Sequence, residues 1–229
     1  MNILAIIPAR GKSKGIPQKN LQIVAGHPLV AWSIKAAKAS AYINRIIVST
    51  DDHSIAETAL AYGAEVVKRP DEISGDEATS ESALLHVLDT LQAIEGYRPD
   101  LIVFLQCTSP LTMTEDIDHC IAKLRSENAD TATTVTHFHY FLWRETSDGN
   151  AEGINHNKSI RERRQDRSPQ YIETGAVYVM KTEGFLKYKH RFFGKTILSI
   201  MPPARVLEID NPSDLLIADT RLKESERNR

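Results

Sequence analysis

Short apolar runs alternate along the chain with longer segments whose apolar residues recur at helical spacing. The runs at 3–7, 46–48 and 101–105 are too short for helices and predict buried strands. The amphipathic segments that follow them predict helices, which we expect to begin near residues 28, 54 and 79. This alternation of strands and helices predicts an α/β protein with a mostly parallel sheet covered by helices on both faces.

The alternation becomes irregular in the second half of the chain. Thr114 is expected to cap a helix, and the β-branched stretch 131–136 predicts a strand. Between about 137 and 170, aromatic residues, polar turns and the charged run RERRQDR predict a long excursion from the sheet, and such excursions often serve function or contact a partner. Strands at 175–180 and 196–201 follow, and Asn211 and Pro212 should start a last helix. We expect one domain over 1–229 with this excursion inserted.

Composition and net charge narrow the classes of partner that the chain is expected to bind. The 229 residues carry 28 basic and 30 acidic side chains, a formal net charge of −2, which does not favour a nucleic-acid or membrane-surface binder. No apolar run approaches the roughly 20 residues of a membrane span, and the first residues lack the features of a signal peptide, so we expect a cytosolic protein. Cys107 and Cys120 have no metal-ligand spacing and are expected to be buried free thiols.

The first predicted strand runs into an unusually basic loop, IIPARGKSKGIPQKN. The eleven residues after Pro8 include two glycines, one arginine and three lysines. Glycine lets the backbone approach a ligand closely, and clustered cations balance concentrated negative charge. Open α/β sheets bind ligands at the carboxyl ends of their strands, so the loop predicts a polyphosphate site.

Other interpretations of this loop exist. Gly11 to Gly15 satisfies G-x-S-x-G, in which Ser13 would be the nucleophile of an α/β-hydrolase. That motif needs a helix directly after the serine, whereas the next helix is expected only near Pro28. A Walker A loop fails because no Gly-Lys-Ser/Thr follows at the required spacing. A solvated basic loop without a ligand remains the plain alternative.

Five motifs in series resemble one family. IPARGKSKGIPQKN, VSTDD, VVKRPDEIS, LQCTSPL and TGAVYV, in this order and spacing, resemble the acylneuraminate cytidylyltransferases, which are the CMP-sialic acid synthetases and their nonulosonate relatives. The resemblance implies a nucleotidyltransferase-type three-layer α/β fold and a homodimer. It also implies Mg²⁺-dependent transfer of CMP from CTP to the anomeric hydroxyl of a nonulosonic acid, by direct attack on the α-phosphate with release of pyrophosphate.

The resemblance assigns residues to the nucleotide and its phosphates. Cations and backbone N–H groups would neutralise the α-phosphate and the departing pyrophosphate. The positions that match are Arg10, Gly11, Ser13, Lys14, Lys19, Asn20, Arg69 and Ser80, of which Arg10, Lys14 and Lys19, together with Asp210, are the expected catalytic residues. Solvated surface charge is the alternative for the basic residues, and Ser80 could instead cap its helix.

Glu208 and Asp210 are the expected metal ligands. They stand at i and i+2 at a predicted strand end, where alternation points both side chains to one side. Oxygen ligands suit Mg²⁺, which usually takes one or two carboxylates together with phosphate and water. The family pattern is usually Asp-x-Asp, so Glu208 departs from it by one methylene.

The sugar site is expected to draw on several segments. Gln106 would follow the central strand, an arginine at 164 could pair with the sugar carboxylate, and Phe192 and Phe193 would come from the partner subunit to line an apolar pocket. A simple core pair of the two phenylalanines is the alternative. Thr112 and Thr174 replace residues common in relatives, which leaves the sugar open. The matching positions are Gln106, Arg164, Gln165, Thr174, Tyr178, Phe192 and Phe193.

Two further rival functions stay open beside this expectation and the hydrolase. A CMP-Kdo synthetase would carry an Asp-containing strand end where this chain has Gln106 and the residues after it. A non-enzymatic nucleotide-binding protein would tolerate the departures at Glu208 and Thr112. His137 and His139 share a strand face, but without a third ligand two exposed histidines are the simpler interpretation.

Overall fold

A seven-stranded sheet forms the centre of the computed structural model, which describes residues 1–227. Its strand order is β11-β7-β10-β6-β1-β4-β5. All neighbouring strands run parallel except that β10 is antiparallel to both β6 and β7. The prediction of a mostly parallel sheet is therefore confirmed, and β10 makes the sheet mixed. The strands are β1 Ile3–Pro8, β4 Arg45–Thr50, β5 Glu65–Lys68, β6 Leu101–Leu105, β7 Thr131–Phe138, β10 Gln170–Lys181 and β11 Thr196–Ile200.

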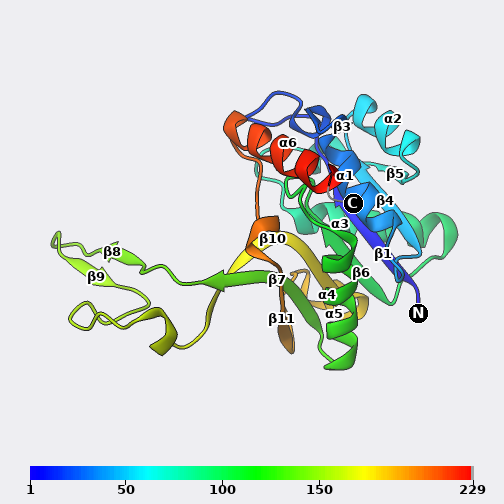
Figure 1. Ribbon diagram of the computed structural model, residues 1–229. Coiled ribbons are helices and arrows are strands. Elements are labelled where there is room, and N and C mark those ends of the chain that lie inside the picture. Colours follow the sequence, from blue (N-terminus) through cyan, green and yellow to red (C-terminus); the bar gives the residue numbers. More distant parts are fainter. Residues whose placement is uncertain (228–229) are drawn as a thin grey trace.

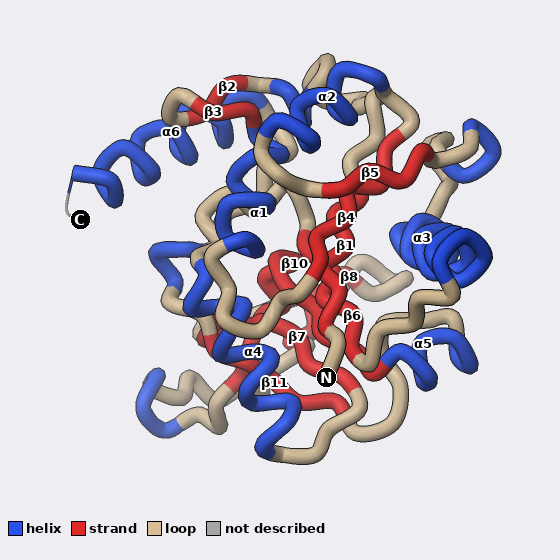
Figure 2. Tube along the Cα trace, turned by 90° about the vertical axis from the view of Figure 1, so that its right-hand side faces the viewer, coloured by secondary structure: helices blue, strands red, loops and turns tan. Residues whose placement is uncertain are grey.

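Helices cover both faces of the sheet and make three layers (Figure 2). One apolar cluster joins α1, α2 and α4 to one face, and a second joins α3 and α5 to the other. Successive residues of β1 alternate between the two clusters, which explains why this central strand is apolar throughout. The helices are α1 Leu29–Lys38, α2 His53–Ala61, α3 Ser80–Glu95, α4 Thr114–Ser126, α5 Thr182–Tyr188 and α6 Pro212–Arg227.

A third apolar cluster lies beneath the basic loop. It joins Ile16 of that loop to Ile209 and to Ala218 and Leu222 of α6. The two-residue strands β2 (Ile23–Val24) and β3 (His27–Pro28) lead from the loop into α1. Packing of α6 against both segments therefore holds the basic loop near the acidic segment at 208–210, although they are almost a full chain apart.

Helix caps explain the place of Ser80 and the start of α4. Thr79 caps α3 by accepting a hydrogen bond from the N–H of Ser82, so the neighbouring Ser80 side chain is not the cap. The expectation that Thr114 caps α4 is wrong. Asp116 accepts the N–H of Met113 at 3.0 Å, and the Thr114 hydroxyl instead donates to the carbonyl of Ala36 in α1. Thr114 is thus the first helical residue and ties α4 to α1.

Residues 139–169, here called the arm, leave the sheet between β7 and β10 and extend away from the body (Figure 1). The arm contains the short hairpin of β8 (Trp143–Glu145) and β9 (Ala151–Gly153) and a 3₁₀ turn at Arg164–Asp166. Further 3₁₀ turns outside the arm lie at Lys19–Leu21, Asp71–Ile73 and Pro203–Arg205. Several large apolar side chains of the arm are exposed, namely Tyr140, Leu142, Trp143, Ile154 and Ile160.

Candidate active site

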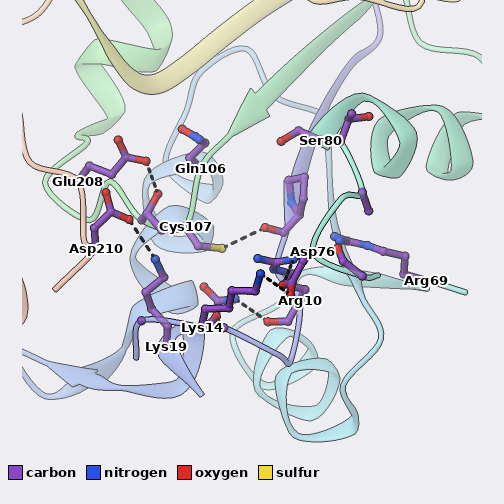
Figure 3. A pocket seen from close by; sticks show the side chains of 18 of the residues that line it. Arg10, Lys14, Lys19, Arg69, Asp76, Ser80, Gln106, Cys107, Glu208 and Asp210 are labelled. Atoms are coloured by element: carbon purple, nitrogen blue, oxygen red, sulfur yellow. Dashed lines mark hydrogen bonds and ion pairs between the residues drawn. The ribbon is translucent and has the colours of Figure 1, made fainter. Parts of the chain in front are cut away.

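A cavity of about 430 Å³ opens at the carboxyl edge of β1 and β6. The ends of parallel strands meet there, and their loops supply the side chains that surround it. Figure 3 shows basic groups of the first loop on one side and the carboxylates of Glu208 and Asp210 on another. Its polar lining includes Arg10, Ser13, Lys14, Lys19, Asn20, Arg69, Asp76, Thr79, Ser80, Gln106, Thr108, Glu208 and Asp210.

Glycines let the basic loop pack closely against other backbone. A Cβ atom on Gly15 would lie 2.8 Å from the carbonyl oxygen of Asp210, so this close approach requires glycine. The N–H of Gly11 donates to Asp51 Oδ1 at 2.9 Å, which fixes the start of the loop against the end of β4. The backbone of the loop is therefore held at Gly11 and Gly15, and Arg10, Lys14 and Lys19 line the cavity.

Arg10 and Lys14 converge on one carboxylate. Arg10 Nη1 lies 3.2 Å from Asp76 Oδ1, and Lys14 Nζ lies 2.8 Å from Asp76 Oδ2. Arg10 also donates to the carbonyl of Gly75 at 2.9 Å. Asp76 lies in the loop before α3 and was not expected in the site, because nothing local in the sequence indicates which distant cations it meets.

Lys19 and Asn20 connect the loop to its surroundings. The Lys19 ammonium donates to the carbonyl of Ile209 at 2.7 Å and lies 3.4 Å from Asp210 Oδ1, with its side chain only 16% exposed. Asn20 is buried, and its amide donates to the carbonyl of Arg10 at 3.0 Å. Asn20 thus supports the backbone that carries Arg10, while Lys19 reaches the acidic segment.

Glu208 and Asp210 face the cavity, although they do not stand at a strand end as expected. Residues 206–210 belong to no helix or strand, and the N–H of Ile209 donates to the carbonyl of Thr108 at 2.8 Å. Ile209 is buried between the two exposed carboxylates. Partial desolvation, and then the charge of Asp210, raise the pKa of Glu208. Two crowded oxygen ligands of this kind fit a hard cation such as Mg²⁺.

Arg69 and Ser80 line the opposite wall. Arg69 is buried after β5 and donates to the side-chain and main-chain oxygens of Ser49 at 3.1 and 2.6 Å. Burial lowers the pKa of Arg69, but arginine stays charged in proteins. Cys107 lies in the cavity floor and Cys120 in the core; both are free, as expected, and burial raises the pKa of each thiol to about 12.

An aromatic group lies beside the cavity. Phe104 lines the cavity and stacks on Tyr178, which Phe192 of the same chain meets edge-on at 6.0 Å. The Arg191 guanidinium lies over the rings of Phe104 and Tyr178 and pairs with Glu81 at 2.7 Å. The sequence interpretation overlooked this ion pair. The Tyr178 hydroxyl donates to Glu173, and burial followed by that contact raises its pKa.

Four predicted sugar residues lie elsewhere in this chain. Thr174 is buried behind the cavity, where its hydroxyl lies 2.7 Å from that of Thr134. Arg164 and Gln165 lie in the arm, and Phe193 stacks on Tyr188 of α5. Of the predicted sugar residues, only Gln106 lines the cavity itself, which it does beside the backbone of Gly175.

The structure tests two alternative interpretations. Ser13 lines the cavity, but no helix follows it directly, and among the described residues no histidine lines this cavity. The hydrolase geometry is therefore missing. Within residues 1–227, no group of three or more His, Cys, Asp and Glu side chains is placed to hold a metal, which also applies to His137 and His139.

A sheet edge that gathers cations, carboxylates and a glycine-rich loop in one cavity is the arrangement of a nucleotidyltransferase. The family model described as cytidylyltransferase matches residues 4–213. N-acylneuraminate cytidylyltransferase A of Danio rerio is 36% identical over 96% of this chain, which spans only about half (51%) of that relative. Pseudaminic acid cytidylyltransferase of Campylobacter jejuni is 31% identical, with 95% of each chain covered. The chain belongs to the cytidylyltransferase family.

Solved structures support the fold. CMP:2-keto-3-deoxy-manno-octonic acid synthetase complexed with CTP superposes with a TM-score of 0.70 at 15% identity and covers 99% of this chain and 100% of that one. 4-diphosphocytidyl-2C-methyl-D-erythritol synthase of Anaerococcus prevotii gives a TM-score of 0.69 at 16% identity and covers 97% and 98% of the two chains. Among residues 1–227, no helix has the length and apolar character needed to cross a membrane.

Proposed function

We propose that the chain is a Mg²⁺-dependent cytidylyltransferase that transfers CMP from CTP to the anomeric hydroxyl of a nonulosonic acid and releases pyrophosphate. The single observation that carries the proposal is the cavity in which Arg10, Lys14 and Lys19 face the carboxylates of Glu208 and Asp210. The family match and the acylneuraminate and pseudaminic acid relatives support this choice of nucleotide and sugar class.

Positioning and charge stabilisation account for the chemistry. The anomeric hydroxyl attacks the α-phosphate directly, so no protein nucleophile is needed. Arg10 and Lys14 neutralise the triphosphate and the departing pyrophosphate, and Lys19 orients the acidic segment. Glu208 and Asp210 would hold Mg²⁺, which supplies Lewis-acid charge neutralisation when bound.

A homodimer is part of the proposal, with the arm reaching toward the partner's sugar site. Two observations support a sugar site that is shared between two subunits. The arm exposes large apolar side chains, which commonly mark an interaction surface, and none of its residues lines the cavity of its own chain. Arg164 and Gln165 would then contact the sugar across the interface. Phe192 already meets Tyr178 within one chain, so that ring contact needs no partner.

The test is pyrophosphate release from CTP and Mg²⁺ with a panel of sugars. The panel contains sialic, pseudaminic and legionaminic acids, the deaminated sugar and Kdo, with UTP and ATP in place of CTP as controls. We expect release with CTP and one nonulosonic acid. Release with Kdo alone would establish the rival synthetase. No release with any sugar would favour a non-enzymatic nucleotide-binding protein and would contradict the proposal.

A further inference from the structure

The carboxylate of Asp76 occupies a position between two cations that the proposed function assigns to the triphosphate. One carboxylate oxygen faces Arg10 and the other faces Lys14, at 3.2 and 2.8 Å. All three side chains line the cavity, and Figure 3 shows them close together. A polyphosphate that binds Arg10 and Lys14 directly must compete with this carboxylate for the same N–H donors.

The loop that carries Asp76 is exposed at residues 75–77. It joins the 3₁₀ turn at Asp71–Ile73 to α3, and the Asp76 side chain is 45% exposed. The space where a Cβ atom of Gly75 would lie is open, although the Gly75 carbonyl accepts hydrogen bonds from Arg10 and from the N–H of Ala78. The contact with Lys14 lowers the pKa of Asp76, so the carboxylate is charged at neutral pH and competes as an anion.

We propose that Asp76 is a built-in counter-ion that holds Arg10 and Lys14 in position and is displaced by the polyphosphate of the substrate. The inference rests on the proposed function. The consequence is selectivity. Every anion that uses both cations must displace the carboxylate, which lowers the affinity of that anion for the site. A single phosphate makes few compensating contacts, whereas a nucleoside triphosphate reaches further groups of the cavity. Asp76 therefore sets the affinity threshold of the site for polyphosphates.

The experiment measures CTP and inorganic pyrophosphate binding by calorimetry, in the presence and in the absence of Mg²⁺ and without sugar. Asp76→Asn removes the competing charge and should tighten binding of both ligands about two- to fivefold, because ion pairs of an exposed carboxylate are weak. Glu77→Gln makes the same charge change one residue away, at an exposed side chain that does not line the cavity, and should change the dissociation constant less than about twofold.

A double-mutant cycle separates direct competition from general repulsion. If Asp76 acts by pairing with Lys14, the gain from Asp76→Asn shrinks in a Lys14→Met background. A gain of equal size in both backgrounds, unchanged binding, or weaker binding in Asp76→Asn would overturn the inference. Weaker binding only with Mg²⁺ would make Asp76 a metal ligand instead. Asp76→Ser repeats the test if the first variant does not fold.

The two hypotheses can fail separately. Wild-type protein that binds no CTP contradicts the proposed function, whereas pyrophosphate still reports whether Asp76 competes for the two cations. Wild-type protein that binds CTP and shows no effect of Asp76→Asn contradicts the counter-ion and leaves the proposed function intact.

Discussion

The cavity and the arm hold their side chains in opposite ways. In the cavity, loop residues are tied to buried backbone, as when Lys19 donates to the carbonyl of Ile209 and Asn20 donates to that of Arg10. In the arm, the hairpin pairs only three residues on each strand, and Arg161 and Arg167 lie over the ring of Phe141, each at 4.3 Å. The side chains of the cavity are therefore held by the core of the chain, whereas those of the arm are held mostly by other residues of the arm.

This difference teaches which part of the proposed reaction one chain can organise alone. Stabilisation of phosphate charge needs groups that are already oriented, and the third apolar cluster provides that support under the basic loop. Recognition of the sugar is proposed to involve Arg164 and Gln165, which lie in the arm and do not line the cavity of their own chain. We therefore expect substitutions that release the cavity residues from their backbone contacts to impair the reaction. Substitutions in the arm should act through the contact with a second copy of the chain.

The largest effect is expected in the cavity, from Asp210→Ala. The variant removes a proposed Mg²⁺ ligand that the backbone holds beside Gly15. We expect kcat/KM to fall about 10²- to 10³-fold, or about 3–4 kcal/mol of transition-state stabilisation, with CTP binding partly retained. Steady-state pyrophosphate release and calorimetry measure the two quantities. Asp89→Ala, on the exposed face of α3, is the control, and near wild-type turnover of Asp210→Ala would remove Asp210 from the site.

A smaller effect, on stability, is expected from substitution of Arg205, which lies outside the cavity. Its guanidinium donates to the buried carboxylate of Asp116 at 2.7 Å and anchors the start of the segment that carries Glu208 and Asp210. Arg205→Met leaves Asp116 without its cation. We expect a loss of about 2 kcal/mol of unfolding free energy at pH 7, below the roughly 3–5 kcal/mol of a fully buried pair, because Arg205 is 30% exposed.

The pH dependence of Arg205→Met follows from Asp116. Burial already raises the pKa of Asp116, and loss of the arginine raises it further. The folded state then binds a proton more tightly than the unfolded state, so stability falls as pH rises through that window. Urea unfolding should show the deficit of the variant shrinking as pH is lowered toward the ordinary range of aspartate. A deficit that grows on acidification would contradict this account. Lys223→Met breaks an exposed ion pair with Asp219 and serves as the control.

The sequence predicted the parts of this molecule that depend on local pattern. Buried strands appear as short apolar runs, and Gly96 ends α3 in the left-handed conformation that glycine favours. Local pattern also misled, because alternation around Ile209 resembles a strand although no neighbouring strand pairs with it. The contact of Arg10 with the loop at Gly75 could not be predicted, since the two residues lie 65 positions apart and meet only through the sheet.

The smallest effect is expected in the arm, from Leu142→Glu. Leu142 is 44% exposed, and a charge there would disrupt an apolar interface between two copies of the chain without affecting the core of either copy. We expect loss of the dimer by light scattering, a KM for the sugar raised about tenfold, and an unchanged dissociation constant for CTP, because the nucleotide contacts lie within one chain. Ile94→Glu makes the same kind of change at an exposed position of α3 and should leave both the dimer and the sugar KM unaltered. If the Leu142 variant is a monomer with wild-type sugar KM, the arm serves assembly alone, and the sugar must be recognised entirely by residues of the cavity.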